Sequence, residues 1–157
     1  MAKVLILYYS RTGNTAKMAK YVQEGVNTEG VETVLKEVRN ANPKELLNYE
    51  GIIIGSPTYY GSMAGEIKKF LDESVKFHGE LEGKVGGAFS SSANIGGGNE
   101  TTILSILEAL LIHGMIIQGD SKGDHFGPVG IGNPDTRATD ECIKFGKKVA
   151  KLVKALF

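Results

Sequence analysis

The stretch Ser10–Thr15 has the residue types of an anion-binding loop. It follows an apolar run directly and leads into a segment with helical spacing, so its hydroxyl groups stand beside the first N–H groups of a helix. Those N–H groups attract an anion, and Gly13 lets the backbone approach it closely. The stretch has neither the lysine of a nucleotide-hydrolysing P-loop nor the G-x-G-x-x-G pattern of a dinucleotide fold. A phosphate monoester fits best; the alternative is that Ser10 and Thr12 only cap the helix.

Two further polar stretches that contain glycine follow later apolar runs. Residues 56–62 include the adjacent aromatic residues Tyr59 and Tyr60, which can form a wall against a flat heteroaromatic ring. Residues 90–98 end in three glycines, whose flexible backbone can approach the edge of the same ring, with Asn99 or a neighbour capping the next helix. The alternative for the aromatic pair is that one tyrosine simply packs in the core.

Short apolar runs alternate with segments of helical spacing along the whole chain, which predicts a doubly wound α/β fold with a five-stranded parallel sheet. The expected strands are Val4–Tyr9, Val31–Leu35, Ile52–Ile54, Val85–Phe89 and Met115–Ile117. Pro43 is expected to start one short helical turn, and residues 119–139 form the one long irregular stretch. Ligands bind outside the carboxyl ends of strands in such sheets, so the three polar stretches are expected to face one crevice.

Composition narrows the class of protein. The 157 residues are expected to form one domain, residues 1–157, with a core that needs no disulfide or structural metal. Lys plus Arg and Asp plus Glu number 18 each, and this balance argues against nucleic-acid and anionic-membrane partners. The single cysteine, Cys142, excludes multi-cysteine metal sites and is expected to be a small core residue. The first apolar run is too short for a signal peptide or a membrane span, so a cytoplasmic location is expected.

Four motifs in order along the chain resemble the flavodoxin-like superfamily. They are Ser10–Thr15, residues 57–65, Gly96–Thr101 and residues 112–115. Within the superfamily they are most similar to the WrbA group of NAD(P)H:quinone oxidoreductases, over nearly the whole chain. The resemblance implies FMN as the cofactor and the sheet order 2-1-3-4-5. The chain lacks the insertion that longer members carry near residues 39–48, and it contains no Trp for the aromatic lid of some relatives.

The resemblance also implies roles for individual residues. The first stretch would hold the FMN phosphate, the second would flank the isoalloxazine, and the glycine-rich stretch would line its other edge. The candidate cofactor-binding residues are Ser10, Arg11, Thr12, Gly13, Asn14, Thr15, Pro57, Thr58, Tyr59, Tyr60, Gly61, Ser92, Ala93, Asn94, Ile95, Gly96, Gly97, Gly98 and His125.

Two histidines are candidates for handling protons or negative charge near the flavin. His113 precedes a Gly-Met pair as in the family, and it is the candidate catalytic residue. The alternative is a histidine that only benefits from the dipole at a helix end. His125 could serve the same purpose or be only a surface residue of a loop.

The implied function is electron transfer from NAD(P)H through FMN to a quinone or a similar flat, small acceptor. The alternative is a flavodoxin that carries single electrons between protein partners, although such carriers are typically strongly acidic around the flavin and this chain is balanced. A third possibility is an FMN-storing or regulatory module without activity. The apolar segment Ile103–Leu111 is compatible with a homodimer or homotetramer, or with a position deep in the core.

Overall fold

Strands and helices alternate along residues 1–157, all of which the computed structural model describes. The strands are β1 (Lys3–Tyr8), β2 (Glu32–Glu37), β3 (Gly51–Pro57), β4 (Val85–Ser92), β5 (Ile116–Ile117) and β6 (Val129–Ile131). The helices are α1 (Asn14–Thr28), α2 (Gly65–Glu73), α3 (Asn99–Ile112) and α4 (Thr136–Leu156), with short 3-10 turns η1 (Val38–Asn40), η2 (Pro43–Asn48) and η3 (Ser74–Phe77). The turn expected at Pro43 is therefore present.

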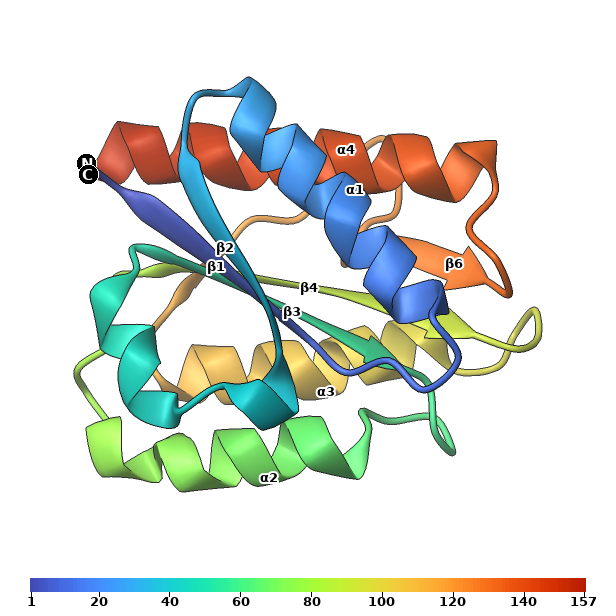
Figure 1. Cartoon of the computed structure of the whole chain (residues 1–157), viewed down its shortest axis with the longest axis horizontal. Coiled ribbons are helices and arrows are strands. Elements are labelled where there is room, and N and C mark those ends of the chain that lie inside the picture. Colours follow the sequence, from blue (N-terminus) through green and yellow to red (C-terminus); the bar gives the residue numbers. More distant parts are fainter.

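The sheet is parallel and has the order β2-β1-β3-β4-β5, which confirms the predicted fold class. Helices α1 and α4 cover one face, and α2 and α3 cover the other (Figure 1). Because side chains alternate along a strand, Val4 and Ile6 pack toward α1 and α4, whereas Leu5 and Leu7 pack toward α2 and α3. All four side chains are fully buried. The carboxyl ends of β1, β3 and β4 meet at one edge of the sheet (right in Figure 1).

The fifth position of the sheet differs from the prediction in one respect. Two short strands occupy it: β5 pairs with the start of β4, and β6 pairs with its last residues, Ser90–Ser92. The stretch 119–139, predicted to be irregular throughout, therefore contains β6 and the start of α4, which Asp135 caps by accepting a hydrogen bond from the Ala138 N–H. The sequence hides β6 because its apolar residues Val129 and Ile131 alternate with glycine over only three residues.

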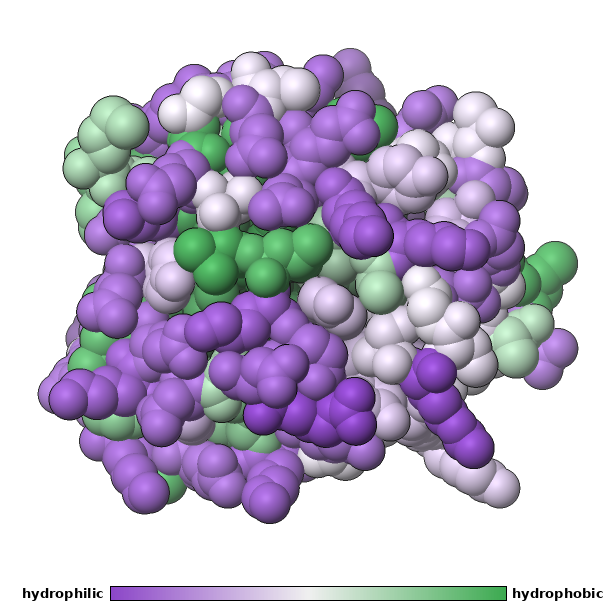
Figure 2. All heavy atoms as spheres, viewed as in Figure 1, coloured by the Kyte–Doolittle hydropathy of each residue, from purple (hydrophilic) through white to green (hydrophobic).

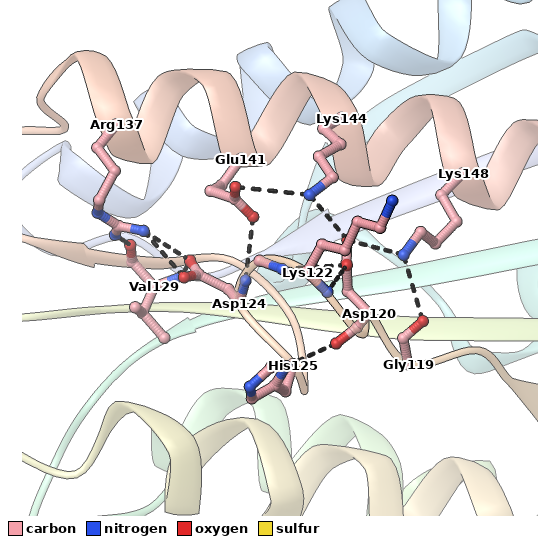
Figure 3. A network of polar contacts seen from close by, with 11 residues as sticks. Gly119, Asp120, Lys122, Asp124, His125, Val129, Arg137, Glu141, Lys144 and Lys148 are labelled. Atoms are coloured by element: carbon pink, nitrogen blue, oxygen red, sulfur yellow. Dashed lines mark hydrogen bonds and ion pairs between the residues drawn. The ribbon is translucent and has the colours of Figure 1, made fainter.

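Residues 118–128 leave the sheet between β5 and β6 and are fastened to α4 by charged side chains (Figure 3). The Asp120 carboxylate accepts hydrogen bonds from the N–H groups of Lys122 and Gly123 and pairs with Lys148 at 2.7 Å and Lys144 at 3.2 Å. These donors hold the pKa of Asp120 well below its usual range, the Lys148 contact being the strongest. Asp124 pairs with Arg137 at 2.9 Å in the same network. The network therefore fixes where β6 begins.

The contact between α1 and α4 depends on two glycines. A Cβ atom on Gly25 would lie 2.1 Å from the carbonyl oxygen of Ile143, and one on Gly146 would lie 2.2 Å from that of Val22. The helices therefore approach backbone to backbone. Cys142 lies in the same layer, fully buried as predicted, and burial raises the pKa of its thiol to about 12.

The face shown in Figure 2 is mainly hydrophilic, with one small apolar patch near its centre in front of β1 and β2. Residues 33–37 of β2 are only half-buried, as expected for a strand at the edge of a sheet. None of the helices combines the length and the apolar character needed to cross a membrane.

Candidate functional site

A cleft of about 570 Å³ opens where β1, β3, β4 and β6 end, at the place that the sheet topology predicts. Its volume falls in the range of small-molecule and cofactor sites, ~300–1,000 Å³. It is lined by Arg11, Thr12, Asn14, Thr15, Pro57, Thr58, Tyr59, Ser91, Ser92, Ala93 and Gly132. Nine of these were candidates from the sequence; Ser91 and Gly132 were not.

The loop after β1 leaves backbone donors free at the start of α1. Ser10 Oγ accepts hydrogen bonds from the N–H groups of Gly13 (3.1 Å) and Ala16 (3.2 Å), so Ser10 caps the helix as the alternative interpretation held. The N–H groups of Asn14 and Thr15 have no acceptor within the helix, and both residues line the cleft. No acidic residue stands in the first turn to satisfy the helix dipole. An anion in the cleft would therefore meet unpaired donors at the positive end of α1.

The hydroxyls of Thr12 and Thr15 have different surroundings. Thr15 Oγ1 is buried and lies 2.8 Å from Ser91 Oγ, a contact that joins α1 to the end of β4. Thr12 is exposed, lines the cleft and makes no hydrogen bond within the protein. The capping alternative therefore does not apply to Thr12, whose hydroxyl is free for a ligand.

The two adjacent tyrosines occupy different positions. Tyr59 is half-buried, lines the cleft, and meets Tyr9 edge to face with ring centroids 6.5 Å apart. Burial, and next the neighbouring Tyr9, raise the pKa of the Tyr59 hydroxyl, which therefore stays protonated at neutral pH. Tyr60 is fully exposed and does not line the cleft. The tight turn Tyr59–Ser62 directs it outward, with Tyr60 itself at φ 50° and Gly61 at φ 76°.

Asn99 is a positioning residue that the sequence reasoning missed. The sequence indicates a helix cap at Asn99 or a neighbour, and in the structure Gly98 occupies the cap position and Asn99 is the first helical residue. Its buried side chain donates to the carbonyl of Gly130 (3.2 Å) and accepts from the Thr58 hydroxyl (3.4 Å), while its own carbonyl accepts from Ser90 (3.0 Å). It therefore joins the ends of three strands around the cleft.

Residues 94–98 of the glycine-rich stretch do not line the cleft, and residues 94–97 form an exposed rim, whereas Ser91, Ser92 and Ala93 line the cleft. Residues 94–97 are exposed because β4 continues to Ser92, two residues beyond the expected start of the loop. Gly98 packs against Gly61 of the neighbouring loop. A Cβ atom on Gly98 would lie 2.7 Å from the Cα of Gly61, and its φ of 105° also favours glycine. The Thr101 hydroxyl donates to the carbonyl of Gly61 and fixes the two loops together.

Neither histidine lies in the cleft, so the prediction that His113 approaches the ligand pocket is wrong. Helix α3 begins beside the cleft at Asn99 and runs away from it; at ~1.5 Å per residue its length places His113 some ~20 Å distant. His113 instead contacts Ser74 near the opposite end of the sheet. His125 belongs to residues 118–128, where its Nδ1 lies 2.7 Å from the carbonyl oxygen of Asp120.

Charge is sparse in the cleft, whose only charged lining residue is Arg11. A wider groove of about 620 Å³ runs along α4 and is lined by Lys144, Lys147, Lys148 and Lys151. Asp120 pairs with Lys144 and Lys148, and Glu29 lies 3.8 Å from Lys151. That groove is a solvated helix face, and the cleft at the strand ends is the candidate functional site.

Comparisons with known proteins identify the family of the chain. The family model described as flavodoxin domain matches residues 5–96. A flavodoxin of Clostridium saccharobutylicum is 37% identical over 161 residues, covering 99% of this chain and 99% of its own. An NAD(P)H dehydrogenase (quinone) of Archaeoglobus fulgidus is 34% identical over 190 residues, covering 99% and 100%. Among solved structures, a WrbA-like flavodoxin from Agrobacterium tumefaciens superposes with a TM-score of 0.85 and 25% identity, covering 100% of both chains.

Proposed function

Because the chain belongs to the flavodoxin domain family, we propose that it binds FMN in the cleft and passes electrons from NAD(P)H to a quinone or a similar flat acceptor. The observation that carries this proposal is the combination, in one cleft, of unpaired N–H donors at the start of α1 with the aromatic side chain of Tyr59. The first suits a phosphate and the second suits a flat ring.

The residues present fit FMN. A phosphate monoester would accept hydrogen bonds from the N–H groups of Asn14 and Thr15 and from the Thr12 hydroxyl, with Arg11 supplying the one nearby positive charge. The isoalloxazine would lie beside Tyr59 and Thr58, with the exposed rim 94–97 proposed to contact its edge. The cleft volume of about 570 Å³ is sufficient for a ligand of that class.

Bound FMN supplies the redox chemistry, since it can accept two electrons from a nicotinamide and release them to an acceptor. The overall reaction balances as NAD(P)H, a proton and a quinone giving NAD(P)⁺ and a hydroquinone. The chain's own residues would bind the FMN and orient it in the cleft. Tyr59, whose raised pKa keeps it protonated, can donate a hydrogen bond into the cleft, while His113 and His125 lie outside it. The proton consumed in the reaction therefore comes from solvent at the open mouth.

The second candidate is a flavodoxin that carries electrons between proteins. Two relatives named flavodoxin support it, the second being 40% identical over 162 residues in Aquifex aeolicus. The relatives named NAD(P)H dehydrogenase (quinone) include one of Rhizobium rhizogenes that is 40% identical over 141 residues. The balanced charge of the chain favours the enzyme, because carriers that dock on basic partners are typically strongly acidic around the flavin.

Steady-state kinetics distinguish the two candidates. Purified protein loaded with FMN is mixed with NADH or NADPH, and the loss of absorbance at the nicotinamide band is followed with and without benzoquinone. If the chain is the enzyme, we expect continuous oxidation of NADH or NADPH that depends on both the protein and the quinone. The same chain stripped of FMN is the control and is expected to be inactive.

A flavin-loaded protein that fails to oxidise either nicotinamide with benzoquinone, yet exchanges electrons with a small redox protein, would establish the carrier. Failure to retain FMN at all would contradict both candidates.

A further inference from the structure

A second cavity, of about 450 Å³, lies between α2, η3 and α3, at the end of α3 far from the cleft. Its volume is in the range of small-ligand sites. Its walls include the apolar side chains of Leu71, Val75 and Ile112, and both His78 and His113 line it. Lys68 and Asp72, also in the lining, form an ion pair of 2.7 Å, and Glu108 is a further charged residue of the lining.

The hydrogen bonds of Ser74 determine which nitrogen of His113 carries the proton. Ser74 Oγ lies 2.6 Å from the carbonyl oxygen of Leu71, and its one hydrogen must point there because a carbonyl cannot donate. The contact of 2.8 Å between Ser74 Oγ and His113 Nε2 is therefore donated by Nε2–H. Burial, and next the neighbouring His78, lower the pKa of His113, so the ring is neutral at pH 7. Nδ1 consequently carries a lone pair and no proton.

That lone pair has no partner. His113 is only 7% exposed, and its Nδ1 is buried without a hydrogen bond. Buried polar atoms nearly always have a hydrogen-bond partner, and a buried polar atom without one costs free energy. A donor supplied by a bound molecule would remove that cost.

We propose that this cavity binds a small, uncharged aromatic molecule that carries a hydroxyl group, which donates to His113 Nδ1 while the ring packs against Leu71, Val75 and Ile112. A neutral ligand is favoured because a cation would lose its hydration at a buried nitrogen. The exposed ring of His78 lies tilted by 41° with its centroid 6.0 Å from that of His113, and it makes no hydrogen bond. Because Nδ1 itself is buried, the proposal requires this exposed ring to rotate and open the approach to it. This site is separate from the FMN cleft and does not depend on the proposed reaction.

Phenol and toluene are the probes, since they have similar size and only phenol can donate. Each is titrated into the FMN-loaded full chain and followed by calorimetry and by ¹⁵N resonances of the histidine rings. Phenol is expected to bind about five- to tenfold more tightly, the effect of one hydrogen bond. Phenol, unlike toluene, is expected to move the His113 Nδ1 resonance toward that of a hydrogen-bonded acceptor.

Two variants separate the hydrogen bond from apolar contact. His113→Phe keeps a ring but removes the acceptor, so the preference for phenol should disappear. His125→Phe alters an exposed histidine on residues 118–128 and should leave the preference unchanged. If His113→Phe does not fold, the Nδ1 resonance of the unmodified chain decides alone.

Equal affinity for phenol and toluene, or phenol binding without a change at Nδ1, would overturn the proposal. So would a shift of the Nδ1 resonance that follows protein concentration without any probe, because it would assign the surface to contact between copies of the chain.

Discussion

At the scale of single residues, the hydroxyl groups around the cleft divide into those that hold the protein together and those that remain free. Ser10 caps α1, and Thr15 is bonded to Ser91. Thr12 has no partner in the chain. The sequence shows only that these three hydroxyls lie close to the start of a helix. Which of them forms a hydrogen bond within the protein depends on the conformation of the folded loop.

Replacing Thr12 by Ala should weaken the binding of FMN by about 1–3 kcal/mol, because it removes a hydrogen bond to a charged phosphate. Fluorescence titration of FMN into the stripped protein measures the change in Kd. Thr28→Ala is the matched control, since Thr28 lies at the other end of α1 and donates to the carbonyl of Gly25. An unchanged Kd in the Thr12 variant would remove this loop from the phosphate site.

Burial of His113 makes stability depend on pH. Its pKa is lower in the folded chain than the ordinary value of 6.5, so the unfolded chain binds more protons as pH falls through that value. The contribution of His113 to stability is therefore fully present above pH 6.5 and is lost progressively below it. Urea unfolding at pH 7.5 and pH 5.5 should show a smaller loss of free energy in His113→Phe than in the unmodified chain. Equal losses would show that His113 is not the responsible group.

At the scale of secondary-structure elements, α3 positions the cleft through its first residue. A single helix connects the two regions that the sequence placed together, with Asn99 at the cleft and His113 at the other end. His113 is remote from the cleft because α3 begins beside the cleft at Asn99 and runs away from it. Helix direction follows from the parallel connections of the sheet, and applying that rule to His113 would have corrected the prediction.

Asn99→Ala should loosen the ends of three strands. We expect unfolding free energy to fall by about 1–3 kcal/mol, since the carbonyl of Gly130 and the hydroxyl of Thr58 lose a partner. FMN affinity should fall as well, because Thr58 lines the cleft. Denaturant unfolding and FMN titration give the two quantities. Asn48→Ala, at an exposed residue without side-chain hydrogen bonds, should change neither, and loss of stability with intact FMN affinity would limit Asn99 to a structural role.

The close contact between α1 and α4 is a second feature at the scale of secondary-structure elements. Gly146→Ala should destabilise the fold by about 1–3 kcal/mol despite the better helix propensity of alanine, because the new Cβ would meet the carbonyl oxygen of Val22. Gly65→Ala is the control: nothing lies within 4 Å of its Cβ position, and it should be neutral or slightly stabilising. Thermal unfolding compares the two variants. If Gly146→Ala matched its control, the close approach of the two helices would be refuted.

At the scale of the whole molecule, the fold was predictable because its signals are strong and local. The runs that form β1, β3 and β4 are apolar on both faces, and a sheet covered by helices on both sides is the arrangement that buries them. The division of the fifth position between β5 and β6 was not predictable. β6 has three residues. Backbone pairing joins it to β4, and the long-range network of Asp120 and Asp124 with α4 anchors the segment that leads into it. Such contacts leave no periodic trace in a sequence.

The difference between strong local signals and long-range contacts also explains which site residues the sequence predicts. Ser10–Thr15 and residues 57–59 follow strands that the apolar pattern reveals, so their common location at the carboxyl edge followed from topology. Gly132 follows β6 and was missed with it. The rim 94–97 was placed too far inward, because three serines that look like a loop continue β4 as its last buried residues.

The central claim is that a phosphate group anchors a flavin at the start of α1, and comparing FMN with riboflavin tests it most directly. The two molecules share the isoalloxazine and differ in the phosphate, so calorimetric titration of each into the stripped protein isolates that anchor. We predict one FMN per chain, bound at least ~100-fold more tightly than riboflavin, as several charge-assisted hydrogen bonds of ~1.5–3 kcal/mol each would give. Equal affinities, or no binding of FMN, would contradict the account.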